Sequence, residues 1–156
     1  MPDGPRYDDD YYAWTQYQAE LLRTTRRTDN RLDREHLAEE IEDLGKSERN
    51  AVRSQIVRII EHLLKRQYSP ATDPRLDWQA SIIEARQMLT DSVSATLRRD
   101  AEAALPVLYA RGRQLAGVRL HKFGEIEAAT RLPQECPYTL DQICADEWYP
   151  EPGQAD

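Results

Sequence analysis

Three polar residues recur every seven positions through the middle of the chain and could carry acid–base or metal chemistry. Glu48, Gln55 and His62 follow Ile41 in this series, and on a helix that spacing brings side chains to nearly one side. Seven residues also span about 10 Å along a helix axis, so the three side chains cannot bind one ion together. We therefore expect a buried polar ladder that fixes the alignment of helices, unless another helix supplies a ligand to Glu48 or His62.

A second group combines one imidazole with two carboxylates. His36 is followed by Glu40 and Asp43, so the three side chains share one side of a helix. Such a set could bind a divalent ion through oxygen ligands and one nitrogen. Acidic residues near the start of a helix also stabilise it, because they complement its dipole. We favour this ordinary role and keep the metal site as the alternative.

Other catalytic patterns are missing from the sequence. It contains no glycine-rich phosphate loop, no Gly-x-Ser-x-Gly elbow and no His-Glu-x-x-His motif. Its two cysteines, Cys136 and Cys144, have neither the partners nor the spacing of a zinc tetrad. Cys136 would be a reactive thiol if a cation lowered its pKa, but we expect a half-buried structural thiol, and we predict no cofactor.

The candidate residues lie in a stretch that predicts one long helix. Its acidic residues come early and its basic residues late, as the helix dipole favours. No proline interrupts it, although Gly45 would permit a kink. We predict a helix over about residues 33–68, with an apolar stripe that should face the core. The stripe consists of Leu37, Ile41, Leu44, Val52, Ile56, Ile59, Ile60, Leu63 and Leu64.

The rest of the chain also predicts helices and no sheet, since no segment alternates apolar and polar residues. Pro106 should kink or split the fourth helix, residues 124–133 should be irregular, and a capping box at Thr139 should start a short final helix. The predicted helices begin near Asp8 and then cover about 33–68, 78–89, 97–115 and 140–145. The fold class is therefore all-α, an irregular bundle of four main helices plus a short C-terminal helix.

Composition limits the function classes. The chain has 156 residues and a net charge of −7, which argues against nucleic acid because such binding depends on Lys and Arg. No apolar run is long enough to cross a membrane, and the first residues do not resemble a signal peptide. We expect a cytoplasmic protein with a single domain over residues 7–150, between loose segments at 1–6 and 151–156.

Large aromatic residues gather near both ends of the chain. Two interpretations stay open: the ends pack together and close the bundle, or the rings form an exposed patch that docks a partner. We favour packing. The residues are Tyr7, Tyr11, Tyr12, Trp14, Tyr17, Tyr138, Trp148 and Tyr149.

Four strings give the chain a family resemblance: Tyr7-Asp-Asp-Asp-Tyr-Tyr-Ala-Trp14, Leu37-Ala-Glu-Glu-Ile-Glu-Asp-Leu-Gly-Lys-Ser-Glu48, His62-Leu-Leu-Lys65 and Cys136-Pro-Tyr-Thr139. They resemble the bacterial family known as domain of unknown function 29. The resemblance covers about Tyr7 to Pro150, although Arg66 stands where the family often has Trp. It implies a small α-helical protein and no particular activity.

The function that these patterns favour is a non-catalytic protein-interaction or structural module, with a protein partner or a homo-oligomer. The competing hypothesis is a metal-dependent hydrolase or nuclease. It would use His36, Glu40 and Asp43, or His62 with acidic residues from another helix.

Overall fold

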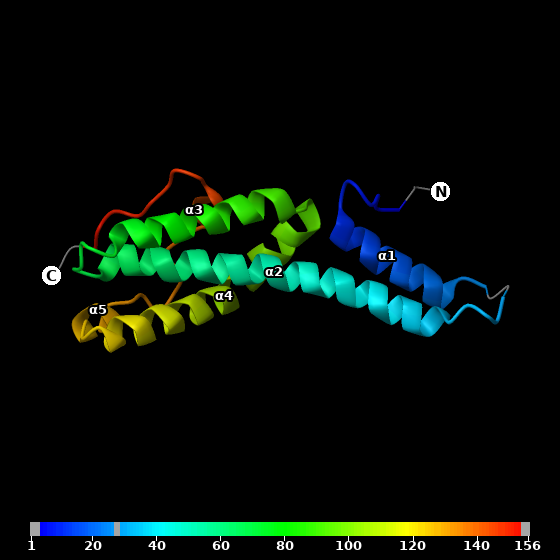
Figure 1. The fold of residues 1–156 in the computed structure, drawn as a ribbon, viewed down its shortest axis with the longest axis horizontal. Coiled ribbons are helices and arrows are strands. Elements are labelled where there is room, and N and C mark those ends of the chain that lie inside the picture. The colour runs from blue at the N-terminus through cyan, green and yellow to red at the C-terminus, as the bar shows by residue number, and fades with distance from the viewer. Residues whose placement is uncertain (1–3, 27–28, 154–156) are drawn as a thin grey trace. The chain divides into compact units, whose positions relative to one another are not determined.

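The structure is a computed structural model that describes residues 4–26 and 29–153. Its regular elements within these ranges are all α-helices (Figure 1), which confirms the predicted fold class. Of the predicted loose ends, residues 1–3 and 154–156 lie outside the described ranges. The helices are α1 (Tyr11–Thr24), α2 (Arg34–Tyr68), α3 (Arg75–Ser92), α4 (Ala95–Lys122), α5 (Ile126–Thr130) and α6 (Leu140–Cys144).

The described residues form two compact units. Of the described residues, unit 1 takes those up to Val52 together with 92–100, and unit 2 takes 53–91 together with those from Ala101 onward. The helices α2 and α4 contribute residues to both units. The single domain expected over 7–150 stays a prediction.

Unit 1 is built on a close approach of α1 to the first part of α2 (Figure 1). Thr15 and Ala19 of α1 are buried, as are Ala38 and Val52 of α2. A Cβ atom at Gly45 would collide with Thr15 Oγ1 and with the side-chain amide of Gln16. Glycine is therefore needed at position 45 because the two helices touch there, and α2 continues through it as one helix.

The start of α1 is fixed by one carboxylate. Asp10 caps the helix by accepting a hydrogen bond from the backbone N–H of Ala13 at 2.9 Å. Its second oxygen accepts from the backbone N–H of Thr96 at 3.2 Å. These hydrogen bonds lower the pKa of Asp10, although burial opposes them as the largest single effect.

The prediction that the whole apolar stripe of α2 faces a core is wrong in unit 1. Leu37 is 40% exposed and Leu44 is 55% exposed. The buried side of α2 there is instead the neighbouring series Ala38, Gly45 and Val52. The reason is side-chain size, because the small residues let the backbone of α1 approach closely while the leucines would hold it away.

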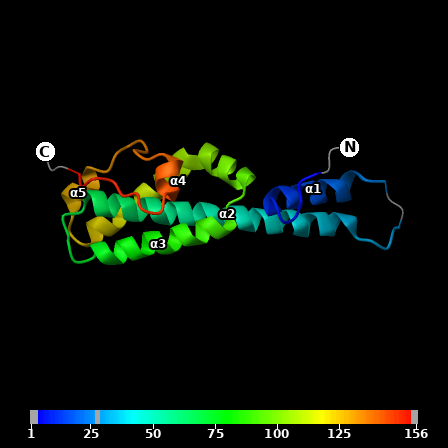
Figure 2. The same ribbon diagram turned by 90° about the horizontal axis from the view of Figure 1, so that it is seen from above.

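In unit 2, α3 and α4 lie along the second part of α2 (Figures 1 and 2). Branched aliphatic residues of α2 are fully buried here, so the predicted stripe does form a core in this unit. At Gly112 of α4, a Cβ would lie 2.6 Å from Ile60 Cγ2, so the absence of a side chain again permits close packing. The largest buried residues include Ile56, Ile59, Ile60, Leu63, Leu64, Ile82, Leu108, Tyr109 and Leu120.

Two predicted details of the later helices need correction. The helix α4 runs through Pro106 as one element, so the predicted split is wrong, whereas the alternative of a kink stays a prediction. The stretch 124–133, predicted to be irregular, contains α5. Gly124 turns the chain between α4 and α5 with a φ of +78°, a conformation typical of a helix end.

The capping box at Thr139 is confirmed. The Thr139 side chain accepts from the backbone N–H of Gln142, and the Gln142 side chain accepts from the backbone N–H of Thr139. The short helix α6 begins at the next residue, as predicted. In the described part of the chain, no helix combines the length and apolar character needed to cross a bilayer.

Replacing Gly45 with alanine should destabilise the protein by about 1–3 kcal/mol, because the added methyl group overpacks the α1–α2 contact. Chemical denaturation followed by circular dichroism measures this change. Gly117→Ala is the matched control: its Cβ would meet only Leu132 Cδ1, at 3.7 Å, so that variant should be neutral or more stable. Equal effects of the two substitutions would contradict the assigned contact.

Candidate functional site

The polar ladder residues have different environments on α2. Glu48 is half-buried in unit 1, whereas Gln55 is half-buried and His62 is buried in unit 2. Gln55 Oε1 and His62 Nδ1 are both buried without a hydrogen-bond partner among the described residues. The carboxylate oxygen Glu61 Oε2 lies 3.7 Å from His62 Nε2. The ladder as a register device stays a prediction.

The proposed metal ligands of the first turns of α2 are all on the surface. His36, Glu40 and Asp43 are exposed, and His36 Nδ1 lies 2.7 Å from Asp33 Oδ2. This contact raises the pKa of His36. Within the described ranges, no three His, Cys, Asp or Glu residues lie close enough to hold a metal ion. Of the three, His36 pairs with Asp33, a carboxylate outside the predicted set.

A buried carboxylate that the sequence did not single out organises unit 2. Glu61 is 3% exposed, and its Oε2 accepts from Lys65 Nζ at 3.0 Å and from Arg119 Nη1 at 2.9 Å. Lys65 is itself 5% exposed and its ammonium lies 5.2 Å from the ring centroid of Trp78. We call Glu61, Lys65, Arg119 and His62 the ion cluster. It joins α2 to α4, and through Trp78 to α3.

Burial sets the charges of the ion cluster. Removal from water lowers the pKa of Lys65, while its hydrogen bond to Glu61 opposes that change. The pKa of His62 is lowered to about 4, first by burial and then by the positive charge of Lys65. The imidazole is therefore neutral near pH 7. A buried, paired carboxylate of this kind joins the helices that carry its partners.

A second buried charge fixes the C-terminal segment. The Arg86 guanidinium is 1% exposed and donates to four backbone carbonyl groups. Nε bonds the carbonyl of Ile143 at 2.9 Å, and the other donors reach Gln142, Asp146 and Trp148. Burial lowers the pKa of Arg86. A planar fork of donors suits this clamp, which fastens residues 142–148 to α3.

The two cysteines and the aromatic rings form separate features of the described chain. Cys136 and Cys144 are half-buried and form no disulfide, and burial raises the pKa of the Cys136 thiol, which disfavours a reactive thiolate. The rings form separate groups: Tyr7, Tyr11 and Trp14 in unit 1, with centroids 4.9–6.0 Å apart, and Tyr138 with Trp148 in unit 2. That the two ends pack together stays a prediction.

The fold and these buried clusters define a class: small all-α proteins whose charged groups join helices. The family model described as "Domain of unknown function DUF29" matches residues 6–149. The chain therefore belongs to this family. A solved structure with a TM-score of 0.82 and 25% identity is described as an alpha-helical protein of unknown function from Rhodospirillum rubrum; the match covers 94% of this chain and 93% of that one. No curated protein matches the chain.

The lowered pKa of His62 predicts that the folded protein loses stability in acid. Its pKa of about 4 in the folded protein is below the ordinary value of about 6.5, so between these pH values the unfolded chain binds a proton that the folded one does not. Lowering the pH from 7 to 5 should cost about 1–2 kcal/mol more in the wild type than in His62→Gln, after allowance for solvent screening. Urea denaturation measures this difference. In NMR titrations, His62 should titrate well below His36, and equal pKa values would contradict its burial.

Replacing Arg86 with lysine keeps the charge but removes the fork, so several carbonyl groups of residues 142–148 lose their partner. We expect a destabilisation of about 3 kcal/mol, with faster hydrogen exchange in that segment. Arg58→Lys is the control, because Arg58 makes an exposed ion pair with Glu84 at 3.2 Å and should change stability by less than about 0.5 kcal/mol. An Arg86→Lys variant with unchanged stability and unchanged hydrogen exchange would contradict the role of Arg86 as a clamp.

Proposed function

We propose that this protein is a non-catalytic interaction module that self-associates through unit 1. The observation that carries this is the uncovered leucine face of α2. Leu37 and Leu44 are 40% and 55% exposed, and Ile41 between them is half-buried. We call Leu37, Ile41 and Leu44 the leucine face. Its spacing of four and then three residues is typical of helices that pack against another helix.

A second copy of the chain is the occupant that best fits the leucine face. The exposed side chains of Leu37 and Leu44 show that no other element of unit 1 covers this side of α2, and an apolar side of a helix becomes stable when another layer covers it. The same face of a second hairpin would complete a four-helix bundle with two-fold symmetry, the commonest symmetry of oligomers.

Charge also supports pairing with a second copy. The helical series of the leucine face continues to Arg34 at one end and to Glu48 at the other, both in steps of three or four residues. The guanidinium of Arg34 donates from Nε to the carbonyl of Leu22 at 2.9 Å, which holds it beside the end of α1 and leaves its charge unneutralised. If the two copies of α2 run antiparallel, Arg34 of each copy lies within about one helical turn of Glu48 of the other. Opposite charges at both ends would favour this orientation, whereas a parallel pair would place Glu48 against Glu48.

The buried groups support a role without catalysis. Within unit 2 the buried carboxylate Glu61 is paired with Lys65 and Arg119, and the buried guanidinium of Arg86 donates to main-chain carbonyl groups, so both charges already have partners inside the protein. No observation on the described residues favours the metal-dependent hydrolase or nuclease. A cytoplasmic location, where thiols persist, is part of this proposal.

Leu44→Glu should convert a dimer to a monomer, because it places two charges in the apolar centre of the interface. Light scattering after gel filtration should give twice 18.1 kDa for the wild type and 18.1 kDa for the variant. Leu76→Glu is the matched control: Leu76 is 76% exposed on α3 in unit 2, so that variant should remain dimeric.

The same mass measurement on Glu48→Arg tests the antiparallel orientation of the two copies of α2. The new arginine would lie near Arg34 of the second copy, and the repulsion between the two positive charges should weaken an antiparallel dimer. A monomeric wild type, or a Leu44→Glu variant that keeps the dimer mass, would overturn the proposed self-association. Circular dichroism should show unchanged helix content in each variant, since Leu44 and Leu76 are both exposed.

A further inference from the structure

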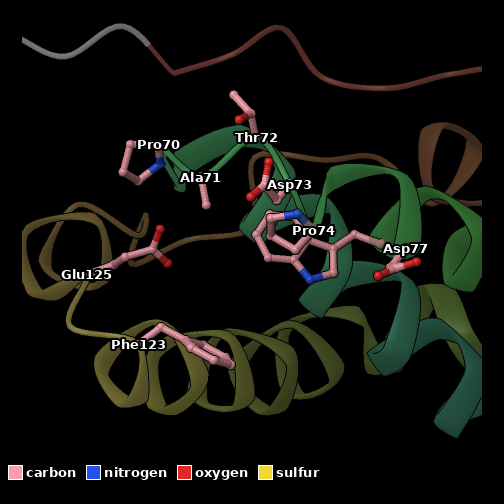
Figure 3. Close-up of a pocket in the computed structure, with 9 residues that line it drawn as sticks. Pro70, Ala71, Thr72, Asp73, Pro74, Asp77, Phe123 and Glu125 are labelled. Carbon is pink, nitrogen blue, oxygen red and sulfur yellow. The ribbon is translucent and has the colours of Figure 1, made fainter.

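A pocket of about 730 Å³ opens in unit 2 where the loop between α2 and α3 meets the junction of α4 and α5. Figure 3 shows Phe123 and Glu125 facing the loop of residues 70–74 across this hollow. None of the residues predicted from the sequence as chemical candidates lines it. It is therefore distinct from both the leucine face and the ion cluster.

The wall of the pocket is apolar and its charges are all negative. Pro70, Ala71 and Pro74 of the loop, with Trp78 of α3 and Phe123 after α4, supply the apolar surface. The charged lining residues are Asp73, Asp77 and Glu125, and none of the nine lining residues is Lys, Arg or His. An aromatic and aliphatic wall with carboxylates suits a ligand that is positively charged at one end and apolar along its length.

Trp78 already shows the property that such a ligand needs. The face of an aromatic ring attracts cations, and tryptophan does so most strongly. The ammonium of Lys65 lies 5.2 Å from the centroid of the Trp78 ring. Lys65 is buried and does not line the pocket. Its ammonium group therefore does not occupy the space that a bound cation would use.

The loop that forms one side of the pocket is held in place by hydrogen bonds. Ser69 Oγ donates to Glu125 Oε1 at 2.5 Å and accepts from the backbone N–H of Ala71 at 3.1 Å. Arg75 donates to the carbonyl groups of Ala71 and Ser69. Two prolines further restrict the backbone. A pocket fixed in this way loses little conformational entropy when a ligand binds.

We propose that this pocket binds an organic cation with an apolar stem, an alkylammonium or alkylguanidinium group. The apolar stem packs on Pro74, Trp78 and Phe123, and the charged end faces the carboxylates. A bare divalent ion fits the pocket less well, because the three carboxylates do not form a group that could hold a metal and a metal ion would leave the apolar wall unused. The same chemistry is offered by a free polyamine and by a basic side chain of a protein.

Calorimetric titration of the full-length protein tests this, with spermidine as one probe and a capped arginine-containing peptide as the other. We expect binding of at least one probe, and the probe that binds more tightly identifies the source of the cation. Asp77→Asn should weaken that binding roughly fivefold, since one carboxylate near the charged end is lost. Glu102→Gln removes the same charge from an exposed position on α4 outside the pocket and should change binding less than twofold.

The variant Trp78→Leu tests whether the ligand needs the aromatic ring itself or only an apolar side chain at this position. Leucine keeps an apolar wall but lacks the ring, so binding should weaken roughly threefold. Asp73→Asn, at an exposed loop residue, supplies a second carboxylate variant whose folding is not at risk.

Several results would overturn the proposal. These are no binding of either probe at millimolar concentration, binding that is unchanged in both Asp77→Asn and Asp73→Asn, and equal weakening by Glu102→Gln. Because the pocket lies wholly in unit 2, failure here leaves self-association through unit 1 unaffected, and the reverse also holds.

Discussion

A buried carboxylate must be paired, and the pairing of Glu61 determines how the helices of unit 2 are joined. Its partners come from one turn further along α2 and from α4, and one of them, Lys65, also contacts the Trp78 ring of α3. Loss of a single partner would leave an uncompensated charge in the interior, which is among the most destabilising changes a core can suffer. The contact between Lys65 and Trp78 also helps to position the Trp78 ring. The wall of the pocket therefore depends on the charge of Lys65, although Lys65 does not line the pocket.

The long helix α2 packs in two different ways, because its two parts carry different kinds of side chain. In unit 1 it presents small residues to α1, and the close approach leaves its leucines outside. In unit 2 it presents branched aliphatic residues, which are fully buried. One continuous apolar stripe is therefore covered along its second part and exposed at Leu37 and Leu44 along its first. Burial alone distinguishes them, because the helical pattern of the two parts is the same.

Local features were predictable and long-range ones were not. The extent of α2 and the capping box at Thr139 depend on residues within a few positions of each other, and both follow from the sequence. The partner of Glu61 at Arg119 lies 58 residues away, and only its i,i+4 spacing to Lys65 offered a signal. The partners of Arg86 are main-chain carbonyl groups, which every residue carries. The residue types at positions 142–148 therefore give no indication that Arg86 binds there. Leu44 was assigned to a core because hydrophobicity shows that a residue is apolar, not which neighbour covers it.

The Arg86 clamp also has a consequence for the order of events during synthesis. Its acceptors follow it by 56–62 residues, so α3 leaves the ribosome long before the carbonyl groups that satisfy its guanidinium. Until those carbonyl groups have been synthesised, the buried site of Arg86 lacks its acceptors, and a buried charge without hydrogen bonds is costly. Closure of unit 2 therefore depends on a contact between distant parts of the chain, a kind of contact that forms slowly during folding.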